Sequence, residues 1–131
     1  MNKLDLSDRC ILVVEDEFSN YQLLEIILRK NNAKILWAKD GVEAIEIFDE
    51  TPCIDLILMD IRMPRMNGIE ATKAIRLKNE HIPIIAQTAY TLDEDIQNTL
   101  KAGCNDHISK PLDIGLLLLK IETLLNRKSV N

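Results

Sequence analysis

Four segments of the chain end in side chains that could act together on a phosphoryl group. Glu15 and Asp16 follow the apolar run CILVV, and Asp60 follows the apolar run LILM. Two further short runs end at Thr88 and Lys110. Carboxylate oxygens are ligands that Mg²⁺ prefers, and a hydroxyl and an ammonium group can stabilise the charge on phosphoryl oxygens. This set of residue types therefore suits a magnesium-dependent phosphoryl transfer.

Each of these side chains also has an ordinary structural explanation. Asp60 could cap a helix or form a turn, and Glu15 with Asp16 could belong to a solvated loop. Thr88 could be the N-cap of the segment that follows it, and Lys110 could be a surface lysine before a turn proline. Position favours the functional interpretation, because each group lies where a different predicted strand ends.

Strands and helices are predicted to alternate five times along the chain. The predicted strands cover residues 10–14, 34–38, 56–59, 83–88 and 107–109, and the predicted helices cover residues 19–30, 41–51, 69–78, 92–102 and 113–127. This order favours an α/β fold with a doubly wound parallel sheet and helices on both faces. The carboxyl ends of parallel strands meet at one edge, so the three acids should repel one another unless a divalent cation binds between them.

Composition indicates a single globular domain in a reducing compartment. The 131 residues carry a formal net charge of −5, which argues against a surface for nucleic acid or anionic membranes. No apolar run is long enough to cross a bilayer. The three cysteines, Cys10, Cys53 and Cys104, lack a CxxC spacing, and we expect all of them to be small core residues of a cytoplasmic protein.

Two predicted helices carry apolar stripes. In the helix over residues 19–30, Leu23, Ile26, Ile27 and Lys30 fall on one stripe, which predicts the buried face. The last helix contains four consecutive leucines, residues 116–119, which is more than one face can bury against a sheet. Part of this run could contact a partner or a second copy of the chain, or it could cover neighbouring helices.

Four motifs, in this order, resemble those of the receiver domains of two-component response regulators. They are Val14-Glu15-Asp16, the segment DIRMPRMNG that starts at Asp60, Thr88-Ala89 and Lys110-Pro111. The resemblance spans about residues 10–125 and implies a single-domain (βα)5 flavodoxin-like fold with strand order 2-1-3-4-5. It implies a receiver domain over residues 9–127, preceded by a short extension (1–8) and followed by a tail (128–131). The local sequence looks most like receivers attached to hybrid sensor histidine kinases, and a single-domain regulator or a phosphorelay intermediate are the alternatives.

The resemblance implies a role for each acid. Asp60 looks like the phosphoacceptor, which attacks the phosphorus of a phosphohistidine on a histidine kinase or a histidine phosphotransfer domain. Asp16 and Asp60 would bind Mg²⁺, and Glu15 would bind it directly or through water. The backbone carbonyl of Arg62 would complete the protein ligands.

A switch is also implied by the resemblance. Lys110 would neutralise one phosphoryl oxygen, and Thr88 would move to hydrogen-bond another. The added charge would bias a two-state equilibrium at the face formed by the last strand and its two flanking helices, through which a homodimer could form. Receivers usually have Tyr or Phe three residues before the lysine, where this chain has His107. An imidazole there could make the switch sensitive to pH, and the alternative is a solvent-facing histidine with no such role.

Three positions beside the acyl phosphate could set its lifetime. In the family, residues at the places of Arg62 and Tyr90 influence how readily water reaches the phosphoryl group. The position of Ala89 is small in the family, which leaves room for the incoming group. Ordinary loop packing is the alternative for Arg62 and Tyr90.

A docking patch for the kinase is expected at the start of the first helix, beside the acidic cluster. It would comprise Phe18, Asn20, Tyr21 and Leu24, because exposed apolar residues next to a site often mark an interface and receivers use this helix against the helical bundle of the kinase. The alternative is that Tyr21 and Leu24 pack on the sheet.

Other classes of protein fit these residues less well. A haloacid-dehalogenase-like phosphatase would need a second acid two residues after Asp60, where this chain has Arg62. A nucleotide- or flavin-binding module would need a glycine- or hydroxyl-rich loop after the first strand, where three consecutive acids would repel phosphates. An interaction module that has lost phosphorylation would not need the complete set of acid, hydroxyl and lysine. We therefore expect a signalling domain that turns over no separate metabolite.

Overall fold

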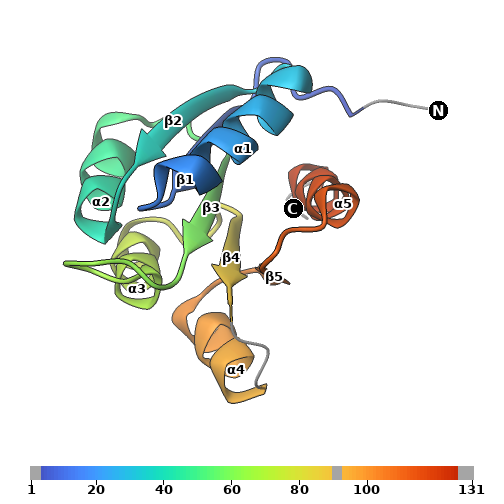
Figure 1. Cartoon of the computed structure of the whole chain (residues 1–131). Helices are drawn as coiled ribbons and strands as arrows, with labels where there is room; N and C mark the ends of the chain where they lie inside the picture. Colours follow the sequence, from blue (N-terminus) through green and yellow to red (C-terminus); the bar gives the residue numbers. More distant parts are fainter. Residues whose placement is uncertain (1–3, 90–92, 127–131) are drawn as a thin grey trace.

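The structure is a computed structural model that describes residues 4–89 and 93–126. Strands and helices alternate along the chain (Figure 1). The strands are β1 (Cys10–Val14), β2 (Lys34–Ala38), β3 (Leu56–Asp60), β4 (Ile84–Thr88) and β5 (Asp106–Ser109). The helices are α1 (Phe18–Lys30), α2 (Gly41–Glu50), α3 (Gly68–Lys78), α4 (Asp93–Ala102) and α5 (Ile114–Leu125). Each predicted element is present, and its bounds differ from the prediction by no more than one or two residues.

The five strands form one parallel sheet in the order β2-β1-β3-β4-β5, as predicted. The three central strands β1, β3 and β4 are buried over their full length, which explains their nearly continuous apolar sequences. The less apolar β2 lies at one edge of the sheet, and β5 forms the other edge.

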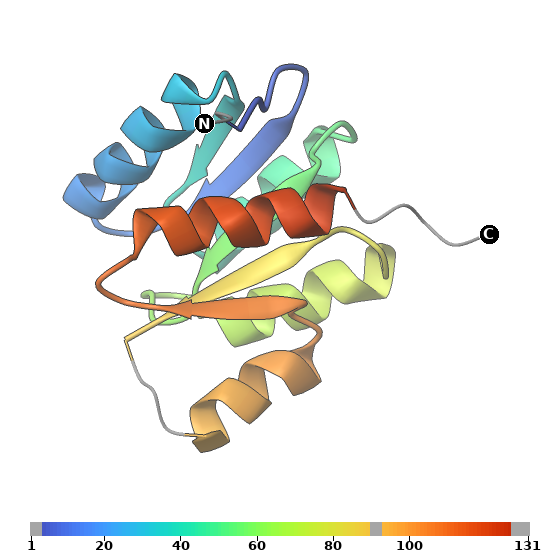
Figure 2. The same ribbon diagram turned by 90° about the vertical axis from the view of Figure 1, so that its right-hand side faces the viewer.

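Helices cover both faces of the sheet. Helices α1 and α5 lie on one face, and α2, α3 and α4 lie on the other; in Figure 2, α5 passes in front of the sheet and α3 lies behind it. Successive strand residues alternate between the two apolar cores, so that Ile11 and Val13 join the α1/α5 core while Leu12 and Val14 join the other. Each fully buried Leu or Ile in these cores stabilises the fold by about 1.5–3 kcal/mol.

The prediction of which face of α1 is buried is wrong. The residues of α1 that are buried against the sheet are Tyr21, Leu24 and Leu28, whereas Leu23 and Ile26 are each 48% exposed. Apolar side chains occupy so much of this helix that more than one stripe could have faced inward. The packing of α1 over β1 and β2 selects the stripe that starts at Tyr21.

The expectation that all three cysteines are core residues holds for two of them. Cys10 and Cys104 are buried, but Cys53 is exposed because it lies in the turn between α2 and β3; all three are free thiols. At the other end of the sheet, Leu6 is buried in the α1/α5 core, and its backbone N–H donates to the carbonyl of Asn31. Among the described residues, no helix has the length and apolar character that a membrane span requires.

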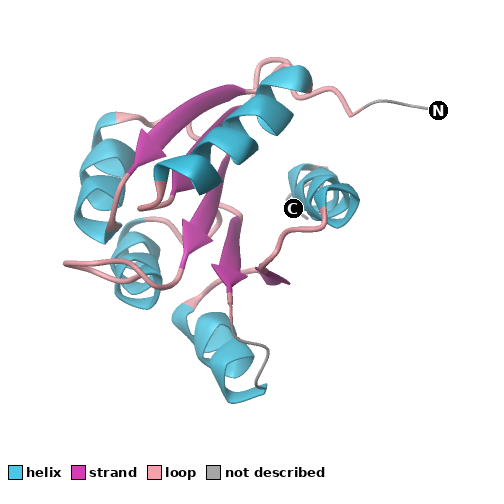
Figure 3. Cartoon of the chain, in the orientation of Figure 1, coloured by secondary structure: helices cyan, strands magenta, loops and turns pink. Residues whose placement is uncertain are grey.

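Side-chain caps fix where several helices begin. Asp40, Asn67 and Asp113 each accept a hydrogen bond from a backbone N–H three residues further on, at the starts of α2, α3 and α5. All three caps lie in loops that follow the carboxyl end of a strand, namely β2, β3 and β5 (Figure 3). The carboxyl edge of the sheet is where the side chains selected from the sequence should meet.

Candidate functional site

Three carboxylates from two neighbouring strand ends meet at the carboxyl edge of the sheet. Glu15 and Asp16 directly follow β1, and Asp60 is the last residue of β3. Each offers one oxygen, and these three oxygens all lie within 4.8 Å of one another. Asp60 is only 4% exposed and Glu15 is fully buried, while Asp16 is open to solvent. Two of the three acids are therefore held in a place where water cannot fully solvate their charge.

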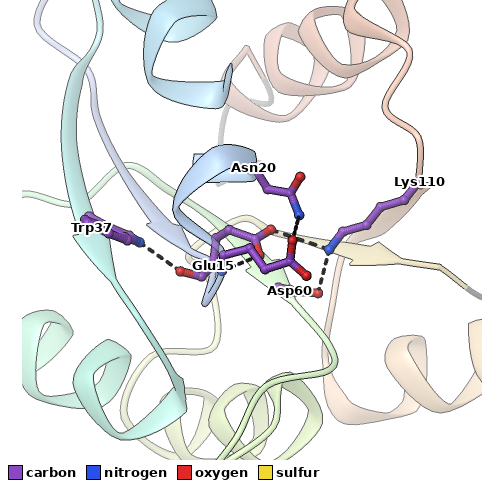
Figure 4. Close-up of polar contacts among 6 residues, drawn as sticks. Glu15, Asn20, Trp37, Asp60 and Lys110 are labelled. Carbon is purple, nitrogen blue, oxygen red and sulfur yellow. Dashed lines mark hydrogen bonds and ion pairs between the residues drawn. The ribbon is translucent and has the colours of Figure 1, made fainter. Parts of the chain in front are cut away.

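Lys110 bridges the two buried acids. Its Nζ lies 3.1 Å from Oδ1 of Asp60 and 3.4 Å from Oε1 of Glu15 (Figure 4). The residue directly follows β5, and its backbone N–H donates to the carbonyl of Thr88 at 2.8 Å. This hydrogen bond between the ends of β4 and β5 fixes where the lysine leaves the sheet.

The electrostatics of the site are dominated by burial. Burial and the nearby Glu15 carboxylate raise the pKa of Asp60 to about 7, although Lys110 opposes the shift. Burial lowers the pKa of Lys110, but the Asp60 and Glu15 carboxylates outweigh this effect, so that the pKa is raised overall. One ammonium group thus faces more negative charge than it can neutralise. An all-oxygen donor set with a deficit of positive charge fits a hard divalent cation such as Mg²⁺.

Glu15 is positioned by its backbone as well as by its carboxylate. Its N–H donates to the carbonyl of Ala38, and its carbonyl accepts a hydrogen bond of 2.8 Å from Nε1 of Trp37 (Figure 4). Its Oε2 accepts a hydrogen bond from the backbone N–H of Glu17 at 3.1 Å. The end of β2 therefore holds the acidic loop after β1 in place.

The loop after Asp60 is held close to the end of β3. A Cβ atom at Gly68 would overlap the Asp60 carbonyl oxygen, so only glycine allows α3 to begin this near the strand. Asn67 and Glu70 form a reciprocal capping box at the start of α3. Arg62 lies in the loop between these points and is exposed.

A cavity of about 260 Å³ opens over the site. Asp16, Asp60, Arg62, Thr88, Ala89 and Lys110 are among the residues that line it, together with Glu17, Asn20, Ile61 and Gln87. Thr88 is buried at the end of β4 and also lines a neighbouring cavity of about 420 Å³ beside α3 and α4. The structure thus brings the predicted acid, hydroxyl and ammonium groups around one space. Tyr90 lies outside the described residues.

His107 lies in the edge strand β5. It is opposite Ala86 of β4 in the register, and its side chain is 31% exposed with Nδ1 3.9 Å from Oδ1 of Asp106. This half-exposed position is compatible with either of the roles expected for the histidine.

Two of the four residues expected in the docking patch, Tyr21 and Leu24, are buried, so the alternative that they pack on the sheet is correct. Leu24 is fully buried, and Tyr21 is 7% exposed and stacks on Trp37 at a ring distance of 4.2 Å. They pack on the sheet because α1 turns the stripe that contains them inward. Phe18 is 57% exposed, and Asn20 is half-buried beside the site. In α5, Leu117 is buried while Leu116 and Leu119 are 42% and 57% exposed.

Two residues at the site were missed in the sequence. Trp37 lies in the edge strand β2 and is the single tryptophan of the chain. The need of its indole N–H for a hydrogen-bond partner was the available signal. Gln87 interrupts the apolar run of β4 one residue before Thr88, and a polar amide in a strand predicted to be buried was the available signal.

The sequence profile described as the response regulator receiver domain matches residues 11–122. This chain belongs to that family. The receiver domain is 41% identical over 121 residues to Hybrid signal transduction histidine kinase I of Dictyostelium discoideum. That match covers 86% of this chain but only 7% of the kinase, so the chain spans a small part of this relative.

Solved receiver structures have the same fold. The receiver domain of sensor histidine kinase PA1611 from Pseudomonas aeruginosa PAO1, with a magnesium ion coordinated in its active site cleft, is 33% identical and has a TM-score of 0.85. The alignment covers 92% of this chain and 100% of that one. A chain in the co-crystal structure of the Saccharomyces cerevisiae histidine phosphotransfer protein Ypd1 with the receiver domain of Ssk1 is 34% identical, with a TM-score of 0.84 and coverage of 91% and 89%.

Proposed function

We propose that this receiver domain accepts a phosphoryl group on Asp60 from a phosphohistidine. A carboxylate oxygen of Asp60 attacks the phosphorus, the P–N bond to the imidazole breaks, and the electron pair of that bond stays on the histidine nitrogen. The observation that carries the proposal is the cluster of Glu15, Asp16 and Asp60, in which Lys110 bridges the two buried acids. This arrangement concentrates charge-stabilising groups around one nucleophile.

Mg²⁺ is the cofactor that the donor set fits. Asp16, Asp60 and the backbone carbonyl of Arg62 would hold it, with Glu15 bound directly or through water. A bound cation would neutralise charge on the phosphoryl oxygens. The ligands come from two strand ends and one loop, and the Trp37–Glu15 hydrogen bond and the cap of α3 position these elements before any ligand binds.

Because the pKa of Asp60 is raised, Lys110 would also keep this carboxyl group ionised before the transfer. A protonated carboxyl group is a poor nucleophile, and the pKa of Asp60 lies at about 7 because of burial and of Glu15. The ammonium group of Lys110, 3.1 Å from Oδ1, favours the ionised form that reacts. After transfer, Lys110 would neutralise one phosphoryl oxygen and Thr88 would hydrogen-bond another.

Phosphorylation would then change the surface of the domain. The added charge draws Thr88 towards Asp60 and biases the face formed by α4, β5 and α5, with His107 as the switching side chain of β5. Ala89 leaves room for the phosphoryl group, and Arg62 with Tyr90 would limit the access of water and so extend its lifetime. The exposed Leu116 of α5 belongs to the face through which a homodimer would form.

The proposed partner is a histidine kinase or a histidine phosphotransfer domain. The Ypd1–Ssk1 co-crystal structure contains such a pair. In this chain, Phe18 and Asn20 are the accessible members of the predicted docking patch. We place the receiver at residues 9–127, and the free thiols fit a cytoplasmic location. It acts as a phosphoacceptor that assists its own phosphorylation and dephosphorylation, and not as an enzyme with a separate substrate.

Intact mass spectrometry tests the phosphoacceptor. After incubation with acetyl phosphate and MgCl₂, we expect the wild-type chain to gain the mass of one phosphoryl group and Asp60→Asn to gain none. Asp40→Asn is a matched control, because Asp40 is also an almost fully buried aspartate but caps α2. The proposal is wrong if the Asp60 variant gains the same mass as the wild type, or if the wild type gains none.

A further inference from the structure

Gln87 is a buried polar side chain that the proposed phosphoryl transfer leaves unused. It is only 1% exposed, and neither its Nε2 nor its Oε1 has a hydrogen-bond partner within residues 4–89 and 93–126. Buried amides are nearly always paired, because an unpaired one loses its bonds to water without compensation. Such a group calls for a partner that the resting site does not supply.

The sheet register places Gln87 next to the phosphoacceptor. Gln87 lies opposite Asp60 on one side and opposite Ile108 on the other. Side chains alternate along a strand, and Ile85, Leu58 and Ile108 all belong to the α1/α5 core. The side chains of Gln87 and Asp60 therefore project from the same face of the sheet. Gln87 also lines the 260 Å³ cavity with Asp60 and Lys110.

The two ends of the carboxamide match the two charged groups beside it. The NH₂ group can only donate, which suits an oxygen of Asp60, and the carbonyl oxygen can only accept, which suits the Lys110 ammonium. In the resting site, Lys110 donates to Asp60 and Glu15 and so already occupies Oδ1 of Asp60. Transfer of a phosphoryl group changes this balance, because Lys110 is then drawn to a phosphoryl oxygen.

We propose that Gln87 is a further residue of the phosphorylation site, whose carboxamide forms its hydrogen bonds only when Asp60 carries a phosphoryl group. Nε2 then donates to the acyl oxygen that Lys110 releases, and Oε1 accepts from the repositioned Nζ of Lys110. This inference rests on the proposed function of Asp60. Interactions that form only in the loaded state stabilise that state relative to the resting one, so Gln87 favours retention of the phosphoryl group.

Gln87→Met tests the idea, because methionine has a similar volume but cannot form these hydrogen bonds. The probe is the beryllium trifluoride anion with MgCl₂, whose binding is followed by NMR titration. We expect an affinity for the probe about tenfold lower than in the wild type, which corresponds to one lost hydrogen bond to a charged group. The melting temperature without ligand should be equal to that of the wild type or higher, because the variant leaves no unpaired amide. Gln87→Leu should behave in the same way.

Thr72→Val provides the matched control. Thr72 is a fully buried polar residue of α3, which covers the face of the sheet opposite to the α1/α5 core, and its hydroxyl contacts Sγ of Cys104. Its replacement should leave the affinity for the probe within twofold of the wild type. Equal binding of the probe by wild type and Gln87→Met would overturn the inference, and so would a lower melting temperature with parallel losses of Mg²⁺ and probe affinity. A wild type that binds no probe and takes no phosphoryl group from acetyl phosphate would instead overturn the proposed function.

Discussion

Two aspartates, one at the end of β3 and one at the start of α2, are almost equally buried but have different partners. Asp60 is 4% exposed and Asp40 is 5% exposed. Asp40 has a full set of partners: its Oδ1 accepts from the backbone N–H of Glu43 at 2.9 Å, and its Oδ2 accepts from Nε of Arg65 at 2.7 Å. Asp60 is held by Lys110, which it shares with Glu15.

The two acids consequently have pKa values shifted in opposite directions. Burial raises the pKa of Asp40, but the hydrogen bonds from the backbone of Glu43 and from Arg65 outweigh it, so that the pKa is lowered overall. Burial and the Glu15 carboxylate raise the pKa of Asp60 to about 7. Equal burial thus accompanies a structural cap in one region and an under-neutralised carboxylate in the other. The groups around each carboxylate therefore set the direction of its pKa shift.

The largest effect on stability is expected from removal of the charge at Asp60. At pH 8 without divalent cations, Asp60→Asn should raise the free energy of unfolding by about 2 kcal/mol, because it removes a poorly neutralised buried carboxylate. Chemical denaturation measures this quantity. A variant less stable than the wild type under these conditions would show that Asp60 is as well satisfied as Asp40.

The gain from Asp60→Asn should depend on pH. The folded-state pKa of Asp60, about 7, lies above the ordinary value of 3.8. Its contribution to wild-type stability is therefore fully present below about pH 4 and is lost as the pH rises through 7. The stability difference between variant and wild type should be smallest near pH 4, grow by at most about 1.4 kcal/mol per pH unit, and level off above pH 7. A difference that stays constant from pH 5 to pH 8 contradicts the raised pKa.

Substitutions at Asp40 should have the opposite sign and a smaller size. Asp40→Ala removes the cap of α2 and should lower the free energy of unfolding at pH 7 by about 1–2 kcal/mol. Asp40→Asn should cost less, because asparagine caps a helix about as well and only the charge is lost. Thermal denaturation of the wild type, Asp40→Asn and Asp40→Ala under the same conditions gives their order of stability. If the two variants were equally destabilised, the ion pair and not the cap would hold this region together.

The smallest effect is expected from the cation partner of Asp40. The side chain of Arg65 is 57% exposed, so solvent screens its 2.6 Å ion pair with Asp40. Arg65→Ala should lower the free energy of unfolding by less than about 1 kcal/mol, and 0.5 M NaCl should diminish the difference. Denaturant titrations at low and high salt check this. A loss larger than that of Asp40→Ala would mean that Arg65 holds the loop after β3 by other contacts.

Several elements could be predicted well because their signals are local. The apolar runs of β1, β3 and β4 are typical of strands buried on both faces. The acids, Thr88 and Lys110 lie at the carboxyl ends of β1, β3, β4 and β5, so each is next in the chain to the strand that positions it. Other features depend on what packs against them. The inward face of α1 was predicted wrongly, since apolar residues on this helix form more than one possible stripe and the position of β2 selects between them. The exposure of Cys53 likewise depends on the turn in which it lies.

The alternation of strands and helices could be predicted from the linear sequence, and so could a phosphoryl-transfer site, because periodicity and the residues that close each run are properties of neighbouring positions. The charge state of each acid depends on groups that only folding brings beside it. Asp40 and Asp60 are the same residue type and almost equally buried. At Asp40 the hydrogen bonds from the Glu43 backbone and from Arg65 outweigh burial and lower the pKa, whereas at Asp60 burial and the Glu15 carboxylate outweigh Lys110 and raise it. The unpaired amide of Gln87 also becomes apparent only when the strands are assembled, because burial and hydrogen-bond partners are set by residues distant in sequence.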